Sequence, residues 1–276
     1  MAERALDFWG KKVAALPREG GLLVSTDLQG NLADYQALKA HQRPDELLLL
    51  VGDLVHGPGG WAVDHWPEYL GTPYLDRSVE LLLDVEAESW SRRILALMGN
   101  HEHAHVGGPR VAKFHADEAA VLDAALGDER GRMHAFLKLF PLLAVGDGVV
   151  FVHGAPAATE PSLDSFEELE YDGYDGLRIR EMYGRDTLAD LLWSRSARTD
   201  QALDLLKVCT GRREGVVVYG HDVVRTGWEA EDDHQLCLST SFGLFDDAKT
   251  MLRLDLGRRV SSVRDLESGL EPLYPT

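Results

Sequence analysis

The chain has 276 residues, 45% hydrophobic and 27% charged, a composition typical of a globular protein with one large core. Its formal net charge of −18 argues against extended contact with nucleic acid or with anionic membranes. We find no apolar run of membrane-spanning length and no basic-then-apolar N-terminus of the secretory kind. The two cysteines, Cys209 and Cys237, lack metal-binding spacing, so we expect a reducing, cytoplasmic location.

Strand-like and helix-like segments follow one another along the chain. Residues 3–16 have apolar positions at helical spacing and predict an N-terminal packing helix that stops at Pro17. We expect strands at 22–25, 46–51, 94–98, 142–145, 149–152, 215–219, 235–240 and 250–255, and helices at 30–38, 78–90, 113–126, 131–139, 186–193 and 199–209. Residues 57–73 predict a long loop, residues 156–186 an irregular acidic cap, and residues 258–276 a polar tail.

The order of these elements is strand, helix, strand, helix, strand, and then mostly hairpins. This order favours an α/β sandwich of mixed sheets flanked by helices over a purely parallel, doubly wound fold. The chain contains no internal repeat, linker or low-complexity segment. We therefore expect a single domain over residues 1–276, with its core at about 20–257.

The stretch Glu46–Gly57, ELLLLVGDLVHG, is the one around which the rest is organised. Its all-apolar run closed by glycine predicts a strand buried on both faces, although periodicity alone also fits a buried helix. In layered α/β proteins, functional residues collect where strands end and loops begin. Asp53, next to Gly52 at that position, is therefore well placed to hold a metal ion.

Four other segments share this pattern of an apolar run followed by Asp, Asn or His beside Gly. With Gly52-Asp53, the segments are Thr26-Asp27-Leu28-Gln29-Gly30-Asn31, Gly99-Asn100-His101-Glu102, His153-Gly154 and Gly220-His221. Each lies at the predicted C-terminal end of a strand. Singly, each has an ordinary alternative: a Gly-Asp turn, a helix cap at Asn100, or a core histidine at His153. Together they indicate one shared site.

The order of these segments resembles the calcineurin-like metallophosphoesterase superfamily, whose pattern is D-x-H-G, G-D, G-N-H-E, V-H-G and G-H. Asp190-Leu191-Leu192-Trp193-Ser194 is similar to the D-x-L-W-S signature of the phosphoprotein (serine/threonine) phosphatase branch, and residues 220–229 are similar to its last histidine segment. The resemblance covers roughly residues 22–230. It implies a four-layer sandwich, with two mixed β-sheets flanked by helices, and hydrolysis of phosphoric esters.

The resemblance also implies two divalent metal ions. Asp27, Gln29 and Asp53 would bind one ion, and Asp53, Asn100, His153 and His221 the other. Carboxylate, amide and imidazole ligands without thiolate suit Mn, Fe, Zn or Ni, and we favour Mn. A hydroxide bridging the ions would attack phosphorus while Asn100 contacts the substrate and His101, as general acid, protonates the leaving oxygen. The alternative for His101 is a surface-loop histidine.

Two departures from the family pattern concern the metal and acid positions. Gln29 stands where the family has His, so we expect a looser first metal site that favours Mn or Mg. His56-Gly57 stands where the phosphatase branch has Asp-Arg, so the carboxylate that would orient His101 is replaced by an imidazole. His56 then either takes part at the active site, in contact with the substrate, or caps a turn.

The phosphate-binding arginine of the branch is absent from its usual position. Arg110, Arg195 and Arg225 each lie a few residues from a motif segment and are candidates to replace it, with a solvated surface arginine as the alternative for each. We predict a phosphomonoesterase acting on a phosphoprotein or a phosphorylated small molecule. The alternatives are a phosphodiesterase or dinucleoside-polyphosphate hydrolase with the same metals, and a binding protein that keeps the fold without turnover.

Overall fold

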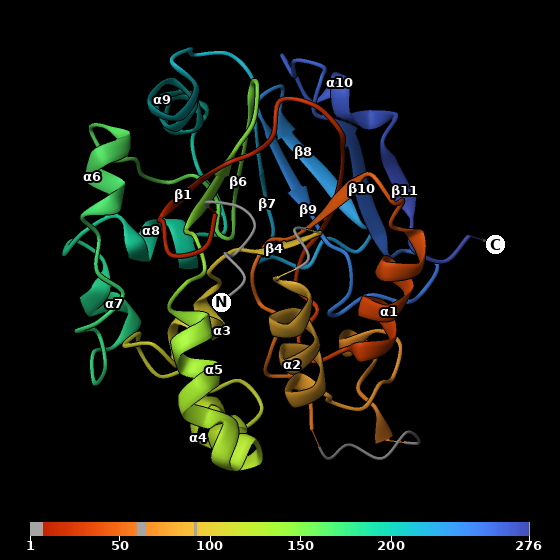
Figure 1. The fold of residues 1–276 in the computed structure, drawn as a ribbon, viewed down its shortest axis with the longest axis vertical. Coiled ribbons are helices and arrows are strands. Elements are labelled where there is room, and N and C mark those ends of the chain that lie inside the picture. The colour runs from red at the N-terminus through yellow and green to blue at the C-terminus, as the bar shows by residue number, and fades with distance from the viewer. Residues whose placement is uncertain (1–7, 60–64, 91–92, 276) are drawn as a thin grey trace.

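Two mixed β-sheets pack face to face between layers of helices (Figure 1). The structure is a computed structural model that describes residues 8–59, 65–90 and 93–275. The first sheet has six strands in the order β1-β5-β6-β7-β9-β8, which are Val13–Ala15, Leu143–Val145, Val149–Val152, Val216–Tyr219, Gln235–Leu238 and Trp228–Asp232. The second has five strands in the order β11-β10-β2-β3-β4, which are Leu270–Pro272, Thr250–Asp255, Gly21–Ser25, Glu46–Leu50 and Ile94–Ala96. The predicted four-layer α/β sandwich is confirmed.

The leucine run of β3 is buried on both faces, as its composition predicts. Leu47 and Leu49 belong to the core between the two sheets, whereas Leu48 and Leu50 belong to the core between sheet and helices. This alternation follows from the two-residue period of a strand. Because β3 is parallel to both β2 and β4, the ends of these strands lie at one edge of the sheet.

The helices form the outer layers. They are α1 Leu32–His41, α2 Ser78–Glu88, α3 Asn100–His103, α4 Glu118–Leu126, α5 Arg130–Leu137, α6 Leu163–Glu167, α7 Ile179–Met182, α8 Leu188–Trp193, α9 Thr199–Thr210 and α10 Arg264–Glu267, with 3₁₀ turns η2 Glu68–Leu70 and η3 Gly127–Glu129. Helix α9 packs on β6 and β7, while α2 contacts α1, α4 and α5 (Figure 1). In the described residues of the predicted 57–73 loop, only η2 is regular, and 60–64 lie outside the description.

The predicted N-terminal helix is wrong in its described part. Residues 13–15 form β1, which pairs in parallel with β5 at the edge of the six-stranded sheet. The backbone N–H groups of Lys12 and Val13 donate to the Glu167 carboxylate, 2.8 and 3.0 Å away. Apolar residues here fit a strand as well as a helix, and pairing with the sheet decides between them. Residues 3–7 of that prediction lie outside the described part.

The tail that we predicted as polar contains regular structure and buried apolar residues. It contains α10 and β11, and Val260, Val263, Leu266 and Leu273 are buried. The hydroxyl of Tyr274 donates to Asp34 Oδ1 at 2.7 Å, and the buried ammonium of Lys249 lies 2.8 Å from Asp34 Oδ2. The apolar side chains of the tail are part of the hydrophobic core, and the Tyr274 hydrogen bond attaches the C-terminus to α1.

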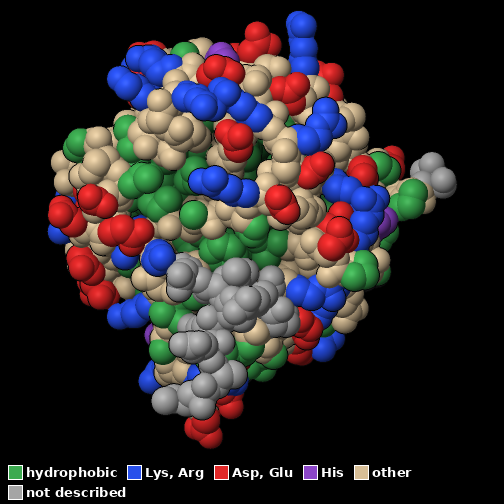
Figure 2. Space-filling model, turned by 45° about the horizontal axis from the view of Figure 1, so that its top comes forward, with side chains coloured by type: hydrophobic (Ala, Val, Ile, Leu, Met, Phe, Trp, Pro, Cys, Tyr) green, Lys and Arg blue, Asp and Glu red, His purple; other side chains and the backbone are tan. Residues whose placement is uncertain are grey.

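Charges of both signs are interspersed over the surface. Figure 2 shows lysine and arginine side chains alternating with aspartate and glutamate on one face of the molecule. Within the described residues, none of the helices has the length and apolarity needed to cross a bilayer.

Candidate metal centre

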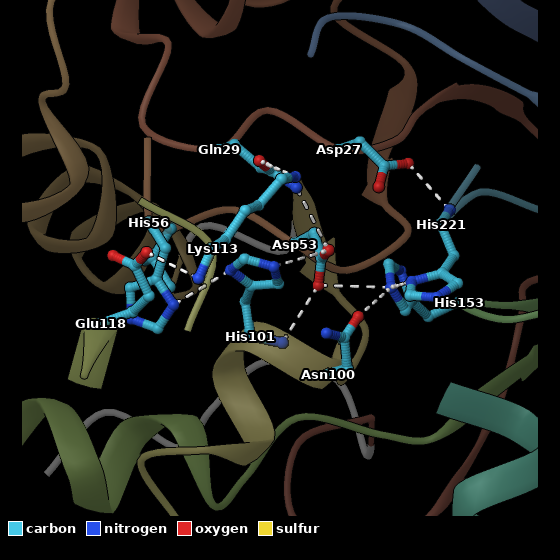
Figure 3. Close-up of polar contacts among 12 residues, drawn as sticks. Asp27, Gln29, Asp53, His56, Asn100, His101, Lys113, Glu118, His153 and His221 are labelled. Atoms are coloured by element: carbon cyan, nitrogen blue, oxygen red, sulfur yellow. Dashed lines mark hydrogen bonds and ion pairs between the residues drawn. The ribbon is translucent and has the colours of Figure 1, made fainter. Parts of the chain in front are cut away.

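The side chains of the predicted segments point toward one another at one place (Figure 3). Asp27 and Asp53 follow β2 and β3, and Asn100 begins α3 directly after β4. His153 and His221 follow β6 and β7, which are parallel neighbours in the other sheet. The site is therefore assembled from strand ends of both sheets.

Backbone strain is concentrated in this site. Among the described residues, the non-glycine residues with positive φ are Asp27, Gln29, Asp53, His56 and His221. Such conformations cost free energy and persist where the surrounding structure holds them. All five are residues that the sequence pattern had singled out.

Two glycines allow the strand ends to approach so closely. A Cβ on Gly52, whose φ is +74°, would lie 2.7 Å from His153 Nδ1. A Cβ on Gly99 would lie 2.4 Å from the backbone nitrogen of Asp53. Both distances are too short for an ordinary contact, so the motif glycines are required by packing.

Three potential ligand atoms converge on His153 Nε2. Asn100 Oδ1, His221 Nδ1 and Asp53 Oδ1 lie 3.0, 3.1 and 3.2 Å from it. The opposite ring nitrogen of His153 lies 3.0 Å from the carbonyl oxygen of Val51 and donates to it, which leaves the lone pair on Nε2 facing the cluster. Ligand atoms around one tetrahedral ion lie roughly 3.4 Å apart when each is about 2.1 Å from the metal.

The charges of the site also call for a cation. Burial lowers the pKa of His153, but the Asp53 carboxylate outweighs it and raises that pKa to about 9. Burial likewise raises the pKa of Asp53, but His101 and His153 hold it well below its usual value. The Asp53 carboxylate thus favours a positive charge beside His153, which a bound metal ion would supply. Asp53, His153 and His221 together can hold a divalent cation, and Asn100 adds a fourth donor.

The position expected for the first metal ion has a different character. The carboxamide of Gln29 donates to Asp53 Oδ2 at 3.4 Å and accepts the ammonium of Lys113 at 2.9 Å. Asp27 Oδ2 accepts the backbone N–H of His221 at 3.1 Å, and burial raises the pKa of Asp27 to about 7. Lys113 therefore supplies a positive charge beside the carboxylates at this position.

Glu102 anchors the loop that carries Asp53. Its Oε2 accepts the backbone N–H groups of Asp53 and Gly99 at 2.8 and 3.1 Å, and its Oε1 accepts those of Leu54 and Val55 at 2.8 and 3.3 Å. The Glu102 side chain is fully buried. The glutamate of the GNHE segment thus holds the backbone of Asp53, a candidate metal ligand, in place.

His101 lies on the other side of Asp53. Its backbone N–H donates to Asp53 Oδ1 at 3.1 Å, and its Nε2 lies 3.7 Å from Asp53 Oδ2. Its Nδ1 lies 3.0 Å from Nδ1 of His56, so His56 occupies the place expected for the orienting carboxylate. Burial lowers the pKa of His101 to about 4, and Asp53 opposes this effect.

The three candidate arginines are placed differently from one another. Arg110 pairs with Asp117 at 3.2 Å on the surface, and Arg225 donates to the carbonyl oxygens of Gly243 and Tyr69. Arg195 lies at the rim, 2.5 Å from Asp222 and 3.4 Å from the carbonyl oxygen of His221. Of the three, only Arg195 contacts a motif segment of the site.

Lys113 is the site residue that sequence reasoning missed. We assigned residues 113–126 to a helix, but α4 begins at Glu118, and the Glu118 carboxylate accepts the backbone N–H groups of Lys113 and His115 at 3.2 and 2.8 Å. This capping turns Lys113 inward, where its ammonium lies 3.6 Å from the ring centroid of Phe242. Asp117, the N-cap of α4, and Glu118, its first residue, were the available sequence signals for a later helix start.

The sequence matches the family described as calcineurin-like phosphoesterase over residues 21–240. The chain therefore belongs to the calcineurin-like phosphoesterases, a class of metal-dependent phosphoester hydrolases. No protein of curated function matches it closely enough to count as a relative.

Solved structures share the fold at low sequence identity. A protein serine/threonine phosphatase from Saccharomyces cerevisiae, with similarity to human PP5, superposes with a TM-score of 0.62 at 13% identity, covering 95% of this chain and 80% of that one. A cold-active protein-tyrosine phosphatase from a Shewanella species gives a TM-score of 0.57 at 13% identity, covering 95% and 82%. These likenesses agree with the phosphoprotein phosphatase branch in fold.

Proposed function

We propose that this protein is a dinuclear metal-dependent phosphomonoesterase, acting on a phosphorylated protein side chain or a phosphorylated small molecule. The observation that carries the proposal is the convergence of Asn100, Asp53 and His221 on His153 Nε2, within 3.0–3.2 Å. These four residues would hold one ion. Asp27, Gln29 and Asp53 would hold the second, with Mn favoured at both positions.

When held by these residues, divalent ions would supply Lewis-acid chemistry for water activation and for neutralising phosphoryl oxygens. The chain's own groups orient the ester and handle the proton. His101 is neutral at rest because burial lowers its pKa, and the negative charge of a bound phosphate would favour its protonation. From Nε2 it would then donate that proton to the leaving oxygen.

Lys113 and Arg195 are the cations that we assign to the phosphoryl group. Lys113 is buried against Phe242 and Gln29, and Arg195 lies at the rim beside His221. They would replace the arginine that this chain lacks after Asp53. Lys113 also opposes a second cation electrostatically, which supports weaker metal binding at the Gln29 position.

The test compares hydrolysis of p-nitrophenyl phosphate with that of bis(p-nitrophenyl) phosphate, in added Mn, by the wild-type protein. We expect the monoester to be turned over faster. Faster turnover of the diester would overturn the proposal in favour of a phosphodiesterase. Binding of metal without turnover of either ester would favour a non-catalytic binding protein.

A further inference from the structure

A continuous chain of hydrogen bonds leads from His101 away from the metal centre. Nδ1 of His101 lies 3.0 Å from Nδ1 of His56, and Nε2 of His56 lies 2.8 Å from Nε2 of His105. Nδ1 of His105 then lies 3.0 Å from Oδ1 of Asp123 on α4. The three imidazoles are buried, whereas the Asp123 side chain is 23% exposed. Figure 3 shows His56 beside His101, on the side away from His153 and His221.

The carboxylate at the end of this chain fixes the direction of every bond in it. An ionised carboxylate only accepts, so His105 must donate from Nδ1 and keep its lone pair on Nε2. His56 must then donate from Nε2 and accept at Nδ1, and His101 must donate from Nδ1. The ring nitrogen of His101 left for chemistry is Nε2, the one that faces Asp53.

Asp123 is itself held in place and kept ionised. Nε2 of His134, on α5, donates to the same Oδ1 at 2.7 Å. Burial alone would raise the pKa of Asp123, but the hydrogen bonds from His105 and His134 bring it below its usual value. Since α4 and α5 pack against each other, both donors converge on one carboxylate.

We propose that Asp123 is a positioning residue that sets the tautomer and orientation of the general acid His101 through His105 and His56. The proposal rests on the phosphomonoesterase function proposed above. In this proposal, the carboxylate that orients His101 is that of Asp123, on helix α4 outside the motif segments. Two imidazole rings, those of His56 and His105, lie between it and His101. No proton has to move along this series of hydrogen bonds. His101 gives its Nε2 proton to the leaving oxygen. It keeps its Nδ1 proton, which donates the hydrogen bond to His56.

The same atoms have a competing use. His105, Asp123 and His134 each offer a ligand atom within 4.8 Å of the others, an arrangement that can hold a metal ion. The chain of three imidazoles favours positioning, because a surface metal site does not require His105 to contact His56. Elemental analysis of Asp123→Asn distinguishes a metal site from a positioning role.

The first measurement is nitrogen-15 NMR of the histidine rings in the wild-type protein, which reads tautomers without any turnover. We expect the proton on Nδ1 in His105 and His101 and on Nε2 in His56. The opposite order in these rings would overturn the proposal, even if the protein hydrolyses phosphomonoesters. Absence of turnover with the expected tautomers would instead contradict only the proposed function.

The second measurement is the kinetics of Asp123→Asn, whose amide no longer dictates which nitrogen of His105 donates. With phenyl phosphate, a poor leaving group, kcat should fall about tenfold or more while KM stays unchanged. With p-nitrophenyl phosphate, whose leaving oxygen needs less protonation, the loss should be smaller. Asp84→Asn, which changes a carboxylate on α2 bound by Tyr35 and Lys39, is the matched control and should leave both rates unchanged.

Two results would overturn the positioning role. The first is an equal loss of kcat for both leaving groups in Asp123→Asn, because a general structural disturbance does not distinguish between them. The second is loss of bound metal from Asp123→Asn by elemental analysis, which would identify the three residues as a cation site. Asp123→Glu should recover part of the lost phenyl phosphate activity.

Discussion

Replacing Glu102 by Gln should destabilise the protein strongly, although the change alters only one atom of the side chain. One carboxylate oxygen of Glu102 accepts the N–H groups of Asp53 and Gly99, and the other accepts those of Leu54 and Val55. A glutamine amide can present its oxygen to one pair of donors only. Its NH₂ group must then face the other pair.

The magnitude follows from the donors left without an acceptor. Each buried N–H group without a partner costs about 1–3 kcal/mol, so two of them cost about 2–6 kcal/mol. Because one of those donors can be that of Asp53, the carboxylate that we propose as a bridging metal ligand should move as well. Disturbing such a support typically weakens metal affinity about 10–100-fold.

The assay is urea unfolding in the presence of a chelator, so that metal binding does not contribute to the free energy of unfolding. Glu80→Gln is the matched control, since Glu80 is exposed and its ion-pair partner among the described residues is Arg77. This change should alter the free energy of unfolding by less than about 0.5 kcal/mol. A Glu102→Gln protein that unfolds within about 1 kcal/mol of the wild type would refute this reasoning.

Three further perturbations test other parts of the structure. Gly52→Ala should cost about 2–4 kcal/mol in urea unfolding and weaken metal binding, because φ is +74° and the new Cβ would lie 2.7 Å from His153; unchanged stability would contradict this. Lys113→Met should tighten metal binding at the weaker, Gln29 position about tenfold in calorimetric titration, because it removes the ammonium group that donates to Gln29. Turnover should fall in the same variant. Unaltered metal affinity would count against electrostatic competition between Lys113 and the metal ion. His103 has its pKa lowered by burial to about 4, below the ordinary 6.5, so the unfolded state binds more protons and stability should fall as pH drops from about 6.5 to 4. With metal removed by a chelator, His103→Gln should reduce this fall in the free energy of unfolding by up to about 3 kcal/mol. Parallel pH profiles of stability for the two proteins would disprove the assignment to His103.

Much of the site could be predicted because its ligands follow buried strands. The apolar run before Asp53 predicts a buried strand, and the end of that strand determines where Asp53 lies. His153 and His221 follow the same logic on the second sheet. What the pattern could not give is the burial of the candidate ligands or the backbone strain at Asp27, since both depend on contacts between distant segments.

Other residues escaped prediction because their role comes from tertiary contacts. Lys113 lay in a segment whose periodicity suggested a helix, and capping by Glu118 instead turns it toward Gln29. Asp123 and His134 lie in two separate predicted helical segments, and only the packing of α4 against α5 brings both to the same hydrogen-bond network. Pairing of β1 with the sheet edge overrode the helical pattern at the N-terminus.

The central claim is that Asp53 carries metal-dependent phosphoester hydrolysis. The most direct test is p-nitrophenyl phosphate turnover by wild type and Asp53→Asn, each measured after chelation and again after Mn is returned, with metal content determined in parallel. We expect the wild type to lose activity on chelation and regain it with Mn, and Asp53→Asn to bind less metal and remain inactive. Turnover that survives chelation, or that persists in Asp53→Asn, would contradict the account.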